Sequence, residues 1–115
     1  MTLADPSMGG ELVLGTGRVI PFDDAGCLAS FVNSGAIPAG QVRSLWVSDF
    51  LPPHALLPVS DAVFLRSDAL HTPMDYHLVA LRRAVADSVR SALGGELLSW
   101  ERVLQTVRGH AEGSS

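Results

Sequence analysis

The sequence predicts an α+β fold of two similar ββαβ halves, packed as one small domain and followed by a C-terminal helix. Short apolar runs rich in β-branched and aromatic residues recur between turn-forming residues, as strands do. The order strand, strand, helix, strand occurs twice, over about 11–50 and 61–108. With 47% hydrophobic residues, the chain can bury a real core. We therefore expect residues 1–115 to form a single domain.

The first half opens with a predicted hairpin. Residues 11–14 form one strand, 15–17 the turn and 18–22 the partner strand, with Pro21 marking a strand end or sheet edge. Asp23 or Asp24 supplies the N-cap of the helix that follows.

That helix is predicted to end at Gly35, a suitable C′ residue. Its buried face follows one helical stripe, made of Cys27, Leu28, Phe31 and Val32. Because Cys27 shares this stripe, we expect it to act as a small core residue rather than as a ligand.

Residues 42–50 are predicted to form the strand that completes the first half. The connector at 51–58 contains three prolines, so we expect no regular ladder there. We expect His54, within this connector, to be exposed to solvent.

The second half repeats the order. Its predicted strands are 62–65, 77–81 and 96–98, and a helix from about Arg83 to Leu93 ends at Gly94. The apolar face of this helix comprises Val85, Val89, Ala92 and Leu93.

Ser99 caps the last predicted helix. The apolar residues of this helix recur at i, i+3, i+4 and i+7, as Trp100, Val103, Leu104 and Val107. From Gly109 onward, including His110, we expect a frayed tail.

Composition excludes several classes of protein. Eight arginines against twelve acidic residues give a net charge of −4 without a basic cluster, which argues against a nucleic-acid partner. A single cysteine excludes an internal disulfide and a structural zinc site built on thiolates alone. No apolar stretch is long enough to span a membrane, and no export signal is visible. No nucleophile triad, phosphate loop or paired carboxylates has supporting context, so we expect no enzyme.

Residues 68–77 join two predicted strands and carry soft and borderline metal ligands. His71, Met74 and His77 lie within this stretch, and Pro73 stiffens the backbone before Met74. A thioether is soft and carries no proton to lose, so it suits Cu(I), and neutral imidazole is an acceptable second donor. The alternative is a capped loop in which Met74 folds onto the core.

Four blocks of the sequence, at residues 22–28, 45–50, 72–74 and 94–100, occur in the order and rough spacing of one family. In these blocks the chain resembles the NosL family, copper-binding accessory lipoproteins associated with nitrous-oxide reductase maturation. The resemblance covers nearly the whole chain. It implies the two-halved ββαβ architecture, Cu(I) binding with Met-type ligation, and tethering outside the cytoplasm, in the periplasm or cell envelope, by a lipidated cysteine.

The chain departs from the family pattern at two places. Family members usually carry a Cys-Gly-Met segment near the mature N-terminus; Met1 falls where that methionine lies, and the cysteine is missing. The native chain either extends upstream of Met1 or lacks the lipid anchor and a thiolate ligand. Asp75 occupies a position at which the family usually has glycine. Its carboxylate is either a weak, hard metal ligand or simply part of an exposed turn.

Met74 is the principal predicted Cu(I) ligand, with Met1, His77 and His71 as candidate helpers. In a regular strand from Met74, Tyr76 and not His77 shares its face, so His77 can join only if a bend or bulge intervenes. The predicted function is a Cu(I)-binding accessory protein or metallochaperone that delivers copper to a partner metalloprotein, possible partners including nitrous-oxide reductase. The alternative is a metal-free binding or assembly module of the same fold.

Overall fold

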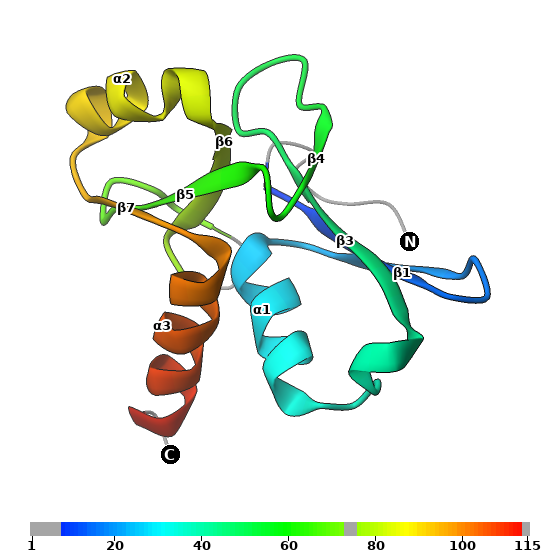
Figure 1. Cartoon of the computed structure of the whole chain (residues 1–115). Coiled ribbons are helices and arrows are strands. Elements are labelled where there is room, and N and C mark those ends of the chain that lie inside the picture. The colour runs from blue at the N-terminus through cyan, green and yellow to red at the C-terminus, as the bar shows by residue number, and fades with distance from the viewer. Residues whose placement is uncertain (1–7, 73–75, 114–115) are drawn as a thin grey trace.

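The computed structural model describes residues 8–72 and 76–113, with side chains up to residue 108 (Figure 1). Its elements, in chain order, are β1 (Gly10–Leu14), β2 (Val19–Phe22), α1 (Ala25–Ser34), the 3-10 turn η1 (Ala39–Gln41), β3 (Val42–Ser48), β4 (Leu56–Pro58), β5 (Ala62–Arg66), β6 (Leu78–Arg82), α2 (Arg83–Leu93), β7 (Glu96–Leu98) and α3 (Trp100–Gly113). The predicted α+β class, with two ββαβ units and a C-terminal helix, is confirmed.

The strands form two antiparallel sheets. The first has the order β2-β1-β3-β4 and the second β6-β5-β7. Helices α1 and α3 lie side by side and pack beneath the sheets, whereas α2 covers the other side of the second sheet (Figure 1). The second sheet therefore lies between two helical layers.

Strand β3 connects the two sheets. The Ser48 N–H donates to the Gly9 carbonyl beside β1 (2.9 Å), but the Phe50 N–H donates to the Ala80 carbonyl of β6 (2.8 Å). Between them, Asp49 forms a parallel bridge with Ala80. The chain that leaves β3 thus exchanges one neighbouring strand for another, from the other half of the molecule.

One apolar core spans both halves. It takes fully buried side chains from both sheets, α1 and α3, including Leu12, Leu28, Val47, Phe64 and Val103. A smaller cluster lies under α2 and is built on Leu65, Leu70, Val79, Leu81 and Ala86.

Local capping explains the limits of α1. Asp24 is the N-cap, and its Oδ1 accepts a hydrogen bond from the Cys27 N–H at 2.6 Å. Gly35 ends the helix with a left-handed φ of 68°, which glycine adopts without steric cost. Both predicted caps are confirmed.

Several boundaries predicted from the sequence are wrong. The connector does contain a strand, β4, because its prolines at 52 and 53 precede the ladder and Pro58 lies at the end of an edge strand. Strand β6 begins at Leu78 rather than at His77. Helix α3 continues to Gly113, because one glycine inside a helix costs only about 1 kcal/mol.

The buried face of α2 is also shifted from the prediction. Ala86 is its buried residue, with Val89 and Leu93 packed beside it, whereas Ala92 is exposed. The predicted stripe of α3 is confirmed, with Val103 and Val107 buried and Trp100 and Leu104 packed against the core.

Candidate metal centre

The four predicted copper ligands fall into two groups. Met1 and Met74 lie outside the described residues, as does Asp75. His71 is exposed, and His77 is half-buried at the end of the loop that leads into β6. The structure therefore describes the imidazole donors of the predicted site.

His77 is tied to the loop between β5 and β6 by three hydrogen bonds. Its backbone N–H donates to the Thr72 Oγ1 at 3.1 Å, and its carbonyl accepts from the Ser67 N–H at 3.0 Å. Its ring Nδ1 lies 2.7 Å from the Leu70 carbonyl oxygen. The buried Thr72 side chain and the buried Leu70 hold this loop on the protein, so the His77 ring is fixed in place.

The bond to Leu70 determines which ring nitrogen of His77 can bind a metal. A carbonyl oxygen only accepts, so Nδ1 carries the hydrogen, and the neutral ring keeps its lone pair on Nε2. A metal-ligating histidine usually donates its other N–H in this way, to a backbone carbonyl or a carboxylate. The Leu70 carbonyl thus orients the His77 ring as in a ligand that binds through Nε2.

His77 also has an uncommon backbone conformation. Its φ is 59°, and that of His54 is 63°; these are the two non-glycine residues with positive φ in the described part of the chain. Such conformations are unusual for side-chain-bearing residues, and they cluster at functional sites. At His77 the left-handed residue interrupts the alternation of side chains just before β6 begins.

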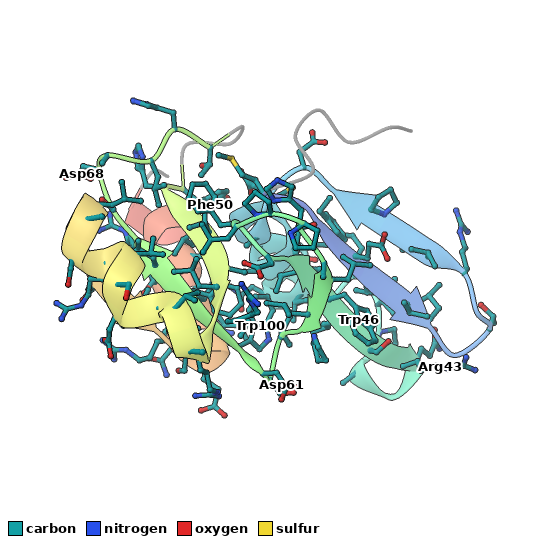
Figure 2. All side chains as sticks on the ribbon, turned by 90° about the horizontal axis from the view of Figure 1, so that it is seen from above. Arg43, Trp46, Phe50, Asp61, Asp68 and Trp100 are labelled. Atoms are coloured by element: carbon teal, nitrogen blue, oxygen red, sulfur yellow. The ribbon has the colours of Figure 1, made fainter. Side chains whose placement is uncertain are left out.

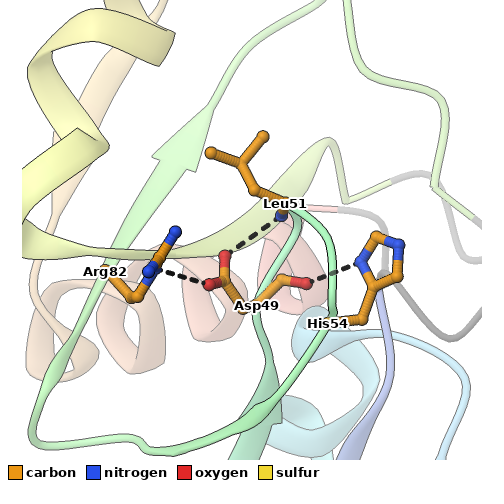
Figure 3. A network of polar contacts seen from close by, with 4 residues as sticks. All are labelled: Asp49, Leu51, His54 and Arg82. Carbon is orange, nitrogen blue, oxygen red and sulfur yellow. Dashed lines mark hydrogen bonds and ion pairs between the residues drawn. The ribbon is translucent and has the colours of Figure 1, made fainter.

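His54 is half-buried, so its predicted exposure is wrong. Its ring Nδ1 lies 3.0 Å from the Asp49 carbonyl oxygen, which pulls the imidazole onto the turn that follows β3 (Figure 3). As in His77, a backbone carbonyl fixes the tautomer and leaves Nε2 as the acceptor.

Asp49 organises the turn that carries His54. Its carboxylate is almost fully buried, accepts the Leu51 N–H at 3.0 Å and pairs with the Arg82 Nε at 2.8 Å (Figure 3). This ion pair joins the end of β3 to the end of β6. The sequence does not predict this ion pair, because no local pattern indicates that these two residues meet.

Met8 is the methionine whose side chain the structure describes. It is half-buried and packs with Phe50 and Leu51 against the cluster under α2. The Met8 thioether therefore contributes to apolar packing.

Cys27 lies on α1, half-buried against the main core, where the sequence placed it. Burial raises the pKa of its thiol, and the nearby carboxylates of Asp24 and Asp23 raise it further. A thiol with a raised pKa is a poor nucleophile and a poor metal ligand at neutral pH.

No group of three or more His, Cys, Asp or Glu side chains able to hold a metal occurs among the residues that the structure describes. Within the same part of the chain, no helix is both long and apolar enough to cross a membrane. A metal bound by His77 would therefore need thioether ligands or ligands from outside the described residues.

Neither a protein-family model nor a curated protein matches the sequence. A solved structure does match: the crystal structure of the copper chaperone NosL from Shewanella denitrificans, with a TM-score of 0.68 and 22% sequence identity, over 81% of this chain and 75% of that chain. The chain has a NosL-like fold. The resemblance to NosL noted in the sequence is thus matched in three dimensions. At 22% sequence identity, the likeness concerns the arrangement of helices and strands and not the metal ligands.

Proposed function

We propose that this protein binds Cu(I) and delivers it to a partner metalloprotein. Two observations support the proposal together. The fold is that of a structure described as a copper chaperone. The His77 imidazole is held by Leu70 with Nε2 as its available donor, at the end of the loop that contains Met74.

The proposed ligand set is Met74 as principal ligand, with His77 or Met1 as helper and His71 as a further candidate. A regular strand would turn His77 away from Met74. The left-handed backbone at His77 departs from that strand geometry, which supports including His77 in the proposed ligand set. Two thioethers and one imidazole would form a soft site of low charge, which suits Cu(I) and permits its release.

The partner and the compartment are part of the same proposal. We propose a location in the periplasm or cell envelope and a role in the maturation of a copper enzyme, nitrous-oxide reductase being the candidate that the resemblance suggests. In this proposal the protein is a copper carrier and not an enzyme. The competing function is a binding module of the same fold that has lost copper.

Anaerobic titration with Cu(I) against a competing chelator, followed by thermal unfolding, tests the proposal. A ligand that binds the native state stabilises it by about 2.7 kcal/mol at a free concentration of 100 Kd. We expect this gain for the wild type and less than about 1 kcal/mol for Met74→Leu, which keeps volume nearly constant while removing the sulfur.

Met8→Leu is the matched control, because it makes the same change at a thioether that packs in an apolar cluster. It should retain the full copper-induced stabilisation. No stabilisation of the wild type would favour the metal-free module. Equal stabilisation of Met74→Leu and the wild type would show that the site lies elsewhere.

The position of Met1 provides a second check. If Met1 and Met74 bind one ion, their sulfur atoms must lie close together in the copper-loaded protein. A separation of more than about one domain radius, ~13 Å, would reject a shared site.

A further inference from the structure

The segment that leads into β6 rests on a glycine of α1. Gly26 lies in the first turn of α1 and is buried, and the Tyr76 side chain lies directly against it. A Cβ atom at residue 26 would lie 2.5 Å from the Tyr76 Cβ and would overlap Cγ and Cδ2 of the ring. Carbon atoms in van der Waals contact are about 3.5–4.0 Å apart, so glycine is the residue that fits beneath Tyr76.

Helix α1 is held too firmly to move aside for a larger residue. It lies near the centre of the molecule, among side chains of both sheets (Figure 2). Its first turn is capped by Asp24, which accepts the Cys27 N–H at 2.6 Å, and Leu28 is fully buried in the main core.

The Tyr76 side chain cannot relieve the overlap by changing its rotamer. The Tyr76 Cβ is bonded to the backbone, so it moves only when the backbone moves. To reach ordinary contact distance from a Cβ at residue 26, it would have to move by about 1 Å. A side chain at residue 26 would therefore displace the backbone at Tyr76.

Tyr76 directly precedes His77, whose conformation depends on its surroundings. The φ of His77 is 59°, and a residue with a side chain keeps such a conformation only where the neighbouring structure holds it. On one side, the Leu70 carbonyl and the Thr72 hydroxyl hold the ring and the backbone N–H. On the other side, the peptide bond to Tyr76 ties His77 to α1.

The hydrogen bond that orients the His77 ring tolerates little displacement. The His77 Nδ1 lies 2.7 Å from the Leu70 carbonyl oxygen, and N–H···O bonds extend to about 3.2 Å. A shift of about 1 Å in the preceding residue exceeds this margin. Once the bond is lost, the proton is free to occupy Nε2, the nitrogen proposed to bind the metal.

We propose that Gly26 is a positioning residue for the His77 donor. Its missing side chain lets Tyr76 rest on α1, and this contact keeps the His77 proton on Nδ1 and the lone pair on Nε2. The importance of Gly26 for copper rests on the proposed function, whereas its effect on the His77 ring does not require copper. A role in packing alone would change stability and leave the His77 tautomer as it is.

Nitrogen-15 NMR of the histidine rings in the copper-free protein, at alkaline pH where imidazole is neutral, provides the first test. We expect a single Nδ1–H tautomer for His77 in the wild type and a mixture of both tautomers in Gly26→Ala. Gly40→Ala is the matched control, because a Cβ at this position meets open space. The His54 ring, held by the Asp49 carbonyl, should keep its tautomer in every variant and so report that the fold is intact.

A double-mutant cycle with Tyr76→Gly separates the contact from a general effect of either residue. Tyr76→Gly removes the three atoms nearest to a Cβ at residue 26, so it should release the His77 tautomer by itself. Adding Gly26→Ala to Tyr76→Gly should then cause no further change. These two variants lack the overlap, so the comparison holds even where Gly26→Ala alone does not fold. A single Nδ1–H tautomer in Tyr76→Gly would overturn the proposal.

Competition with a Cu(I) chelator provides the second test. Loss of the group that orients a ligating histidine typically weakens metal binding by about 10–100-fold, and we expect this loss for Gly26→Ala and none for Gly40→Ala. A wild-type tautomer in Gly26→Ala, or a released tautomer with wild-type Cu(I) affinity, would overturn the proposal. If the wild type binds no Cu(I), the proposed function fails, but the tautomer measurement still decides whether Gly26 positions His77.

Discussion

Replacing Asp49 by asparagine tests whether the ion pair between the ends of β3 and β6 stabilises the fold. Asparagine keeps the size of the side chain and an oxygen that can accept the Leu51 N–H, bonded at 3.0 Å. Its amide NH₂ would face the Arg82 Nε–H, which lies 2.8 Å from the carboxylate. Two donors would then oppose each other at a position that is 1% exposed.

The expected cost follows from these contacts. A hydrogen bond to a charged group contributes about 1.5–3 kcal/mol. The Arg82 side chain is 51% exposed and can return to water, so we take the lower end, about 1.5 kcal/mol. At about 4 °C per kcal/mol for a domain of this size, the melting temperature should fall by about 6 °C.

Urea unfolding of Asp49→Asn, Arg82→Met and the surface control Asp87→Asn provides the measurement. Arg82→Met should cost more, about 3 kcal/mol, because it leaves the buried partner of the pair charged and unpaired. Asp87 is exposed on α2, so its variant should stay within about 0.5 kcal/mol of the wild type. The reasoning would be refuted if Asp49→Asn lowered the free energy of unfolding by less than about 0.5 kcal/mol. It would also be refuted if Arg82→Met lowered it by less than Asp49→Asn does.

Three further predictions concern Cys27 of α1 and Gly95, which directly precedes β7. Cys27→Ala should cost about 1 kcal/mol by urea unfolding and leave Cu(I) affinity unchanged, and a large loss of affinity would contradict a packing role. Because burial and the nearby carboxylates raise the pKa of the Cys27 thiol, its reaction with a disulfide reagent should reach half its maximal rate above the pH of an ordinary cysteine. Gly95→Ala should cost more than about 2 kcal/mol, because φ is +99° and a Cβ would overlap the Arg66 carbonyl. Gly40→Ala, in open space, should stay within about 0.5 kcal/mol, and equal effects would contradict the clash.

The elements that sequence analysis placed well are those with local signals. Asp24 and Gly35 mark the ends of α1, Gly94 marks the end of α2, and Ser99 precedes α3. Caps and turns involve residues close in sequence, so their geometry follows from a few neighbouring side chains. The order of elements, and from it the α+β class, could therefore be predicted.

Long-range contacts explain what was missed. Strand β4 exists because Leu56–Pro58 pairs with β3, and its three residues carry no strand pattern of their own. His54 was expected in solvent, but the Asp49 carbonyl holds its ring.

For the candidate copper site, the sequence predicts a stretch of residues but not a geometry. His71 and His77 are close in sequence, yet one is exposed and the other is fixed by Leu70 and Thr72. Residue type and spacing predict both imidazoles as candidate metal donors. Only the fold distinguishes the immobilised ring from the free one.

The exchange of partners along β3 provides a single reporter of motion between the two sheets. Amide hydrogen exchange requires that a bonded N–H open to water, and its rate gives the free energy of that opening. The Ser48 N–H reports on separation of β3 from Gly9, just before β1, whereas the Phe50 N–H reports on separation of the segment after β3 from β6. Equal protection at the two amides would mean that the halves open together as one cooperative unit. Weaker protection at Phe50 would mean that the contact with β6 opens separately, with a hinge at Asp49, without global unfolding.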